Sequence, residues 1–111
     1  MLMPANDHAA FALFKSYIRD ASGISEDEFN LIAHFLRPVH FNKGAVVLEI
    51  GSVCAHAFHV TRGLLRVATL DKNGDEHIVQ FAPEGWFASD RSSMYFQEPS
   101  HLRIDAIEDT D

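Results

Sequence analysis

Cysteine is almost absent from this sequence, because Cys54 is the only one among 111 residues. A single cysteine excludes an internal disulfide and an iron–sulfur cluster held by the thiolates of one chain. Small secreted domains usually carry several cysteines, so the composition favours a reducing compartment. We therefore expect a cytoplasmic protein, and we expect Cys54 to have a structural role because no cationic residue stands near it in the sequence.

Positive charge is also scarce and scattered. The nine lysine and arginine residues form no run, and sixteen acidic residues bring the formal charge to −7. Nucleic-acid-binding domains gather basic residues into a patch that neutralises phosphates, so we expect no DNA binding by these residues alone. A small anionic ligand is compatible with this charge, because backbone N–H groups can bind phosphate without net positive charge.

Long apolar runs are missing as well. Charged residues or glycine interrupt every apolar stretch before the roughly 20 residues that a membrane span needs. Residues 1–7 lack the basic start and apolar core of a signal peptide. We therefore expect no membrane partner. Apolar residues nevertheless make up 47% of the chain, which is enough for one buried core in a domain of this length.

Helical spacing of apolar residues characterises the N-terminal third of the chain. The apolar residues between positions 8 and 20 recur with the period of an amphipathic helix. Ser25 and Glu28 then have the spacing of a capping box, which predicts the start of a second helix. Pro38 disfavours a helical conformation in the residue before it, so this helix should end near Arg37. The pattern predicts a helical N-terminus over residues 8–37.

From residue 38 onward the apolar spacing changes from helical to alternating. Phe58 and Val60 form one alternating pair, and Val79 and Phe81 form another. Turns rich in glycine and asparagine separate such pairs. Short strands at this spacing predict an antiparallel sandwich or barrel of about seven strands over residues 38–111. Together with the helices it would form a single domain, 1–111.

The last residues of the chain have the pattern of a strand followed by a turn. Residues 104–107 alternate like a strand, and the polar residues 108–111 follow it. A closed roll needs a partner for each strand, so we expect the segment that covers the final strand to lie outside this chain. The apolar residues that this interpretation leaves partly exposed are Leu102, Ile104 and Ala106.

Several short motifs follow one another between the expected strands of residues 24–111. In chain order they are Lys43-Gly44, Gly63-Leu64-Leu65-Arg66, Asp71-Lys72-Asn73-Gly74, Pro83-Glu84-Gly85-Trp86-Phe87 and Ala106-Ile107-Glu108-Asp109. Each is common by itself, but their combined order resembles the effector domain of the Crp/Fnr superfamily of bacterial transcription regulators. The resemblance implies a mainly β fold with N-terminal helices (α+β), an antiparallel β-roll or jelly roll of the cyclic-nucleotide-binding domain type.

The resemblance also implies a sensory role. We expect a ligand-sensing domain that is not an enzyme, requires no cofactor, and responds to a small nucleotide-like or anionic effector. In complete relatives a long helix after the roll forms the dimer interface and leads to a helix-turn-helix that binds DNA. Both elements are absent from this chain, so homodimer formation and DNA binding are expected of a full-length parent.

In that superfamily a phosphate-binding cassette, a short helix followed by a strand, holds the cyclic phosphate. Its pattern resembles Phe-x-Gly-Glu followed some residues later by Arg and then Ser or Thr. On this pattern Phe87 takes the place of Phe, Ser89 of Gly and Asp90 of Glu. Ser100 takes the place of Arg and His101 of Ser or Thr. The ligand-binding residues that the resemblance implies are Phe87, Ser89, Asp90, Arg91, Ser92, Ser100 and His101.

Serine in place of the arginine has the largest expected consequence for ligand binding. A charge-assisted hydrogen bond to phosphate contributes roughly 1.5–3 kcal/mol, about tenfold to a hundredfold in affinity. Arg103 does not replace it, because strand parity places Ser100 on the buried side and Arg103 on the other. The sequence therefore predicts weak binding of cyclic AMP.

Two other interpretations stay open. The first is a degenerate roll that binds nothing and acts as a structural or dimerisation module. The second is a cupin-like metal-dependent enzyme, but His56 and His59 stand three apart, on opposite faces of a strand, and no carboxylate follows at suitable spacing, so we expect no metal. Haem ligation through His77 is disfavoured against an exposed strand position. Trp86 and Phe87 are predicted to plug the core.

Overall fold

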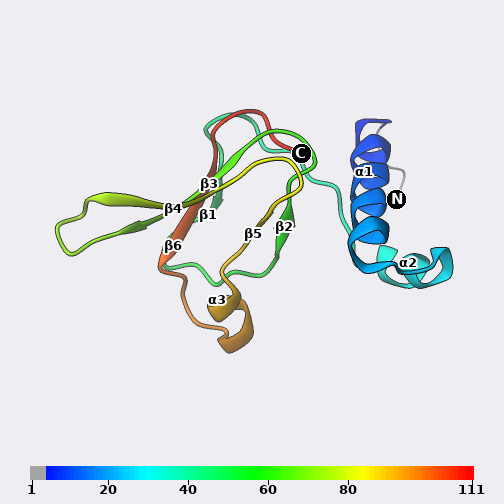
Figure 1. Ribbon diagram of the computed structural model, residues 1–111. Helices are drawn as coiled ribbons and strands as arrows, with labels where there is room; N and C mark the ends of the chain where they lie inside the picture. Colours follow the sequence, from blue (N-terminus) through cyan, green and yellow to red (C-terminus); the bar gives the residue numbers. More distant parts are fainter. Residues whose placement is uncertain (1–4) are drawn as a thin grey trace.

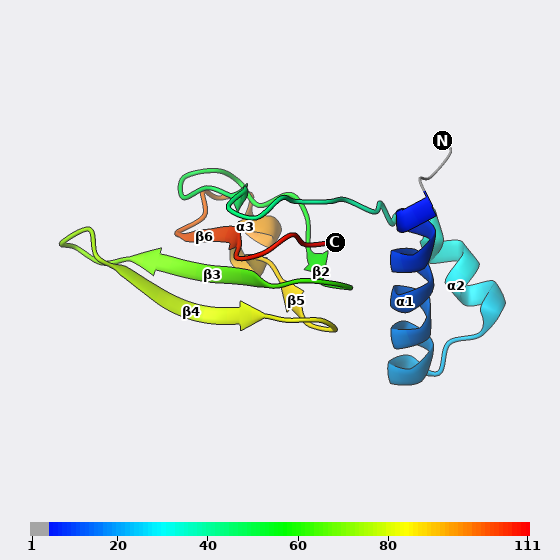
Figure 2. The ribbon, with the colours of Figure 1, turned by 90° about the horizontal axis from the view of Figure 1, so that it is seen from above.

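The computed structural model of the protein describes residues 5–111, and the side chains of residues 12–111. Two helices precede the strands, with α1 on the side of the strands and α2 beyond it (Figures 1 and 2). In chain order the elements are α1 (Ala5–Ser22), α2 (Glu26–Ala33), β1 (Val46–Leu48), β2 (Phe58–His59), β3 (Leu65–Leu70), β4 (Glu76–Ala82), β5 (Phe87–Ala88), α3 (Arg91–Phe96) and β6 (Leu102–Ala106).

The start of α2 is a capping box, as the sequence predicts. The Ser25 hydroxyl accepts from the Glu28 N–H at 3.1 Å, and the Glu28 carboxylate accepts from the Ser25 N–H at 3.3 Å. The helix ends at Ala33, so its expected extension to Arg37 is wrong. Phe35, in the turn that would have followed, is 86% exposed. Because tertiary packing does not bury that turn, little stabilises a helical conformation there.

The strands form two antiparallel sheets. The larger has the order β1-β6-β3-β4, and the smaller pairs β2 with β5. The structure thus has six strands instead of about seven. The difference lies at Phe41, which alternates with Val39 like a strand residue but forms only an isolated bridge with Thr110. The mainly β architecture with N-terminal helices is as the sequence predicts.

Strand β6 lies inside the larger sheet and not at its edge. It pairs with β1 on one side and with β3 on the other. Ile104 is 0% exposed and Ala106 is 2% exposed. The expectation that the final strand would be left partly uncovered is therefore wrong, because alternation shows which residues face inward but not which strands are neighbours.

The core lies between the two sheets and is closed at one end by α3. Its buried residues are Leu48, Cys54, Val60, Leu65, Val67, Ala82, Ala88, Ile104 and Ala106. Partly buried Phe41, Phe58 and Met94 pack against them. In the part of the chain that the structure describes, no helix is long and apolar enough to cross a membrane.

The segment after β6 is fastened to the start of the roll. Phe41 and Thr110 exchange two backbone hydrogen bonds of 2.8 Å. The Thr110 hydroxyl accepts from the Leu64 N–H at 3.1 Å, and Thr110 is only 2% exposed. Gly63, immediately before Leu64, has a φ of +102°, which a residue with a side chain rarely adopts.

Strands β3 and β4 extend beyond the roll as a hairpin arm (Figure 2). Asp71 orders its turn by accepting from the N–H groups of Asn73 and Asp75, at 2.8 Å and 3.0 Å. Its other carboxylate oxygen lies 2.8 Å from His77 Nε2, and these contacts, His77 first, hold the pKa of Asp71 below its usual value. His77 is an exposed residue of β4, as expected.

Candidate functional site

The candidate site, which we call the cassette, runs from β5 through α3 to the start of β6, residues 87–102. Its helix begins where Asp90 caps it, and the Asp90 carboxylate accepts from the Ser93 N–H at 3.1 Å. The polar run before Met94 therefore starts the short helix that the family resemblance implies for the cassette. The cap is the carboxylate and not one of the neighbouring serines, consistent with the favourable interaction between negative charge and a helix start.

Asp90 and Ser100 meet at the centre of the cassette. The Ser100 hydroxyl donates to Asp90 Oδ2 at 2.6 Å and accepts from the Leu102 N–H at 3.0 Å. Ser100 is only 2% exposed, and it faces inward as strand parity predicts. Burial by itself would raise the pKa of Asp90, but hydrogen bonds from Ser100 and from backbone N–H groups of α3 hold it below its usual value. Asp90 is therefore a carboxylate at neutral pH.

A second set of hydrogen bonds ties the cassette to the loop before β2. The Cys54 N–H donates to the Ser93 hydroxyl at 2.8 Å, and that hydroxyl donates to the Glu98 carbonyl. The Asp90 N–H donates to the Cys54 sulfur at 3.5 Å. Sequence reasoning missed Ser93 and gave Cys54 no partner, because the two lie far apart in the chain and no local pattern joins them.

The remaining sequence-predicted residues are not gathered around Asp90. Phe87 is 42% exposed and packs toward α1, and Ser89 is half-buried. His101 is exposed, and its electrostatic interaction with Asp90 helps lower the pKa of that carboxyl. Arg91 and Ser92 are exposed on α3.

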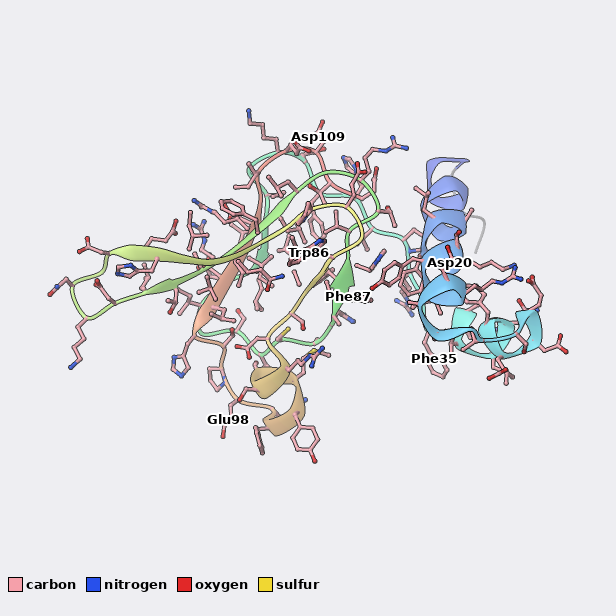
Figure 3. All side chains as sticks on the ribbon, viewed as in Figure 1. Asp20, Phe35, Trp86, Phe87, Glu98 and Asp109 are labelled. Carbon is pink, nitrogen blue, oxygen red and sulfur yellow. The ribbon has the colours of Figure 1, made fainter. Side chains whose placement is uncertain are left out.

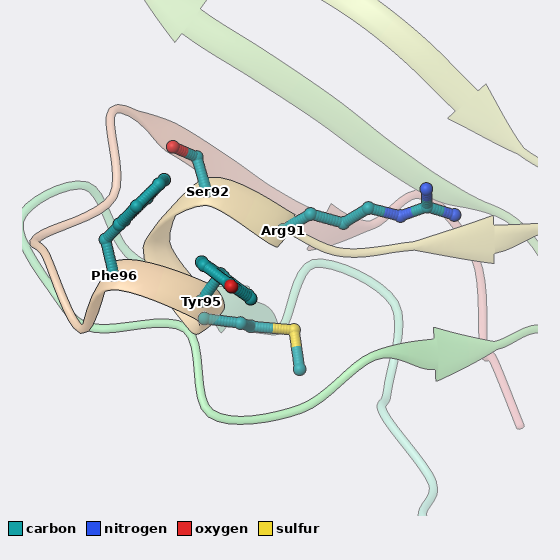
Figure 4. Close-up of a pocket in the computed structure, with 5 residues that line it drawn as sticks. Arg91, Ser92, Tyr95 and Phe96 are labelled. Atoms are coloured by element: carbon teal, nitrogen blue, oxygen red, sulfur yellow. The ribbon is translucent and has the colours of Figure 1, made fainter.

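Arg91 and Ser92 border an open surface depression together with the apolar side chains of α3 (Figure 4). Arg91 extends to the side opposite Phe96. Among the described residues it forms no ion pair with Asp90, and the Asp90 carboxylate has no arginine or lysine partner. The cassette thus carries a negative charge where a phosphate site needs a positive one.

Two further expectations concern aromatic and metal-binding residues. Trp86 is 55% exposed and Phe87 is 42% exposed, so the prediction that they plug the core is wrong. The Trp86 backbone carbonyl accepts a hydrogen bond from the Val60 N–H. The exposed His56 precedes β2, and His59 lies within it. Among residues 12–111, whose side chains the structure describes, no group of three or more His, Cys, Asp or Glu side chains is arranged to hold a metal ion.

Solved structures match this fold, although no family model matches the sequence and no curated protein matches it significantly. Catabolite Activator Protein from Thermus thermophilus superposes with a TM-score of 0.71 at 18% identity, over 80% of this chain and 41% of that protein. The N-terminal domain of a transcriptional regulator from Streptomyces coelicolor A3(2) superposes with a TM-score of 0.68 at 13% identity, over 78% and 60%.

A third match is a CRP/FNR-family transcriptional regulator, also from Thermus thermophilus. It superposes with a TM-score of 0.52 at 25% identity, over 65% of this chain and 37% of that protein. The chain therefore spans less than two thirds of each of these structures. The expected fold is confirmed: the chain has the cyclic-nucleotide-binding-like β-roll of CRP/FNR-family regulators.

Proposed function

We propose that this chain is the sensory domain of a Crp/Fnr-type transcription regulator and that its cassette responds to an effector other than a cyclic nucleotide. The β-roll fold shared with transcription regulators supports the first part. The hydrogen bond between Ser100 and Asp90 carries the second part. It fills the position where the superfamily pattern places an arginine for the cyclic phosphate.

The charge at the cassette disfavours a phosphate for two reasons. Without the arginine, roughly 1.5–3 kcal/mol of charge-assisted hydrogen bonding is missing. A phosphate at the Ser100 hydroxyl would also lie about 5 Å from the Asp90 carboxylate, where like charges repel by about 3 kcal/mol at an effective dielectric constant of about 20. The effector that suits this cassette is neutral or cationic, with a donor group that can replace the Ser100 hydroxyl on Asp90. This proposal departs from the anionic effector that the sequence suggested.

Titration with cyclic AMP and cyclic GMP tests the cassette directly. By isothermal titration calorimetry we expect a dissociation constant weaker than about 100 µM for both. Ser100→Arg should strengthen binding at least about tenfold, because it restores the charge-assisted hydrogen bond. Asn73→Arg is the matched control, since it adds the same charge at an exposed position in the turn between β3 and β4, outside the cassette, and should leave the affinity unchanged. Low-micromolar binding by the unaltered chain would contradict the proposal.

A degenerate roll is the second candidate, and one observation favours it. Both oxygens of the Asp90 carboxylate and the hydroxyls of Ser93 and Ser100 are satisfied within the chain, so the cassette needs no ligand to be stable. Native mass spectrometry of the full-length parent as purified distinguishes the two. A bound small molecule that Ser100→Arg displaces supports a sensor, whereas an intact ligand-free dimer supports a structural module.

The chain by itself is expected not to bind double-stranded DNA. Its formal charge is −7, and its nine basic residues are scattered, so few phosphates could be neutralised at once. A gel-shift titration at roughly 0.15 M salt should show no complex at low-micromolar protein. The full-length parent on the same DNA serves as the positive control. A sub-micromolar shift with the isolated chain would refute this expectation.

A further inference from the structure

An aromatic cluster around His59 joins helix α1 to the roll. The His59 ring lies 4.8 Å from the rings of Phe14 and Tyr17 on α1, measured between centroids. It lies at the same distance from Phe87 of β5, its partner in the smaller sheet. Figure 3 shows Phe87 on the side of the roll that faces α1. The His59 ring of β2 therefore contacts side chains of both α1 and β5.

The imidazole has no hydrogen bond in this cluster. Nδ1 and Nε2 of His59 are both buried, and neither has a partner among the described residues. The side chains of residues 12–33 make no hydrogen bond or ion pair with the roll; Lys15 and Arg19 bind Glu26 within the helical pair instead. In the described part of the chain, the ring contacts of His59 and Phe87 join α1 to the sheets.

We propose that His59 is a pH-sensitive latch: its neutral ring holds α1 against β2 and β5, and its protonation releases the helical pair from the roll. The pH response requires no ligand in the cassette. It would make the position of residues 5–33 depend on pH, with the docked arrangement favoured when the imidazole is neutral.

The burial of the ring sets the direction of this response. A neutral imidazole leaves one N–H without an acceptor in the cluster, whereas the protonated ring would leave two together with a buried charge. The surrounding aromatic rings would offset part of that cost through cation–π contacts. Burial nevertheless lowers the pKa of His59 below its ordinary value of 6.5, and the Gly85 backbone, which is not within hydrogen-bonding geometry, counteracts this only in part.

The pH response comes from the His59 imidazole and not from the groups packed against it. From α1 the facing rings are Phe14 and Tyr17, and Tyr17 is the only ionisable one. From the sheet the facing ring is that of Phe87. Among the described residues no carboxylate or cation contributes to the shift of His59. Because the pKa is lowered in the docked arrangement, docking is strongest above pH 6.5 and weakens as the pH falls below it.

The latch lies next to the cassette in the chain. Phe87 is the first residue of β5, and β5 ends at Ala88, two residues before the Asp90 cap. A change in the packing of Phe87 therefore acts on the strand that positions α3.

Paramagnetic broadening can follow the docking of α1 in the full chain. A nitroxide on Ser16→Cys sits at an exposed position of α1, and Cys54 is only 1% exposed, so the label goes to the new thiol. At pH 7.5 we expect broadening of the amides of β2 and β5. Between pH 7.5 and 5.0 it should fade several-fold, because each unit by which the pKa is lowered changes the docking equilibrium tenfold. The amide signals of β3 should keep their positions in the spectrum over the same pH range.

His59→Phe is the informative variant, because it keeps an aromatic ring in the cluster but cannot be protonated. Its broadening should persist to pH 5.0, while His77→Phe, at an exposed histidine, should behave like the unaltered chain. Fading that is equal in His59→Phe and the unaltered chain would overturn the proposal. The carbon-bound protons of the His59 ring give a second test that needs no substitution at His59. Titration of that ring with a midpoint at or above 6.5 would also overturn it.

Discussion

Gly63→Ala is expected to lower the free energy of unfolding by about 3 kcal/mol or more, the combined cost of backbone strain and overlap. The φ of +102° at Gly63 lies outside the region that side chains tolerate. A Cβ at this position would stand 2.5 Å from the Asp109 carbonyl oxygen and 2.6 Å from the Thr110 hydroxyl. These atoms belong to the segment fastened to Phe41, so they cannot move aside without breaking buried hydrogen bonds. Urea denaturation followed by far-UV circular dichroism measures the loss.

Gly74→Ala is the matched control for Gly63→Ala. Gly74 also has a positive φ, +81°, but a Cβ there meets nothing within 4 Å. It should therefore cost only the backbone strain, about 1–2 kcal/mol. The difference in the free energy of unfolding between the two variants measures the cost of the contact with Asp109 and Thr110. Equal losses in the free energy of unfolding would mean that the segment after β6 does not lie as close to Gly63 as the structure shows.

Arg66→Leu is expected to cost about 2–3 kcal/mol, somewhat less than the loss of one partner from a fully buried ion pair. Arg66 and Asp105 are cross-strand neighbours on β3 and β6, joined by two hydrogen bonds of 3.0 Å and 2.8 Å. The Asp105 side chain is only 12% exposed. Without the guanidinium this carboxylate would lose its charge-assisted partner while water could reach it only partly. Chemical denaturation at neutral pH measures the change.

Arg103→Leu, on the neighbouring strand β6, supplies the comparison. Its guanidinium lies 3.6 Å from Glu49 and 3.8 Å from Glu76, and the Glu49 side chain is 56% exposed. Exposed pairs of this kind contribute about 0–1 kcal/mol, so we expect a loss below about 1 kcal/mol. The double variant Arg66→Leu/Asp105→Leu should recover part of the stability that Arg66→Leu loses, because the nearly buried Asp105 charge is removed with its partner. Glu76, which lies 3.1 Å from Arg66, is one-third exposed and still has Arg103 at 3.8 Å. A loss for Arg66→Leu no larger than that for Arg103→Leu would contradict the assignment.

Local patterns in the sequence were enough to predict the parts of the fold that local interactions determine. The capping box at Ser25 and the inward parity of Ser100 each depend on residues close together in the chain. The order of motifs in residues 24–111 also indicated the β-roll, which the solved structures confirm.

The predictions that failed depend on contacts between distant segments. Trp86 has the composition of a core residue, but only the three-dimensional packing shows that its side chain lies outside the roll. Likewise, Ser93 is hydrogen-bonded to Cys54, which lies 39 positions away in the sequence. His59 contacts residues of α1 with which it shares no sequence pattern. Alternating apolar residues do not specify strand order, so the position of β6 could not be inferred from its sequence.

The place of β6 between β1 and β3 also determines the order in which the sheet can assemble. Neither β1 nor β3 pairs with the other, and both pair with a strand that follows every other strand in the chain. During synthesis the hairpin of β3 and β4 can form as soon as it leaves the ribosome, because its pairing is local. The first strand must wait, unpaired, until residues 102–106 emerge. Closure of the larger sheet is therefore a late, non-local step, and until then the edge of β1 is open to pairing with other chains.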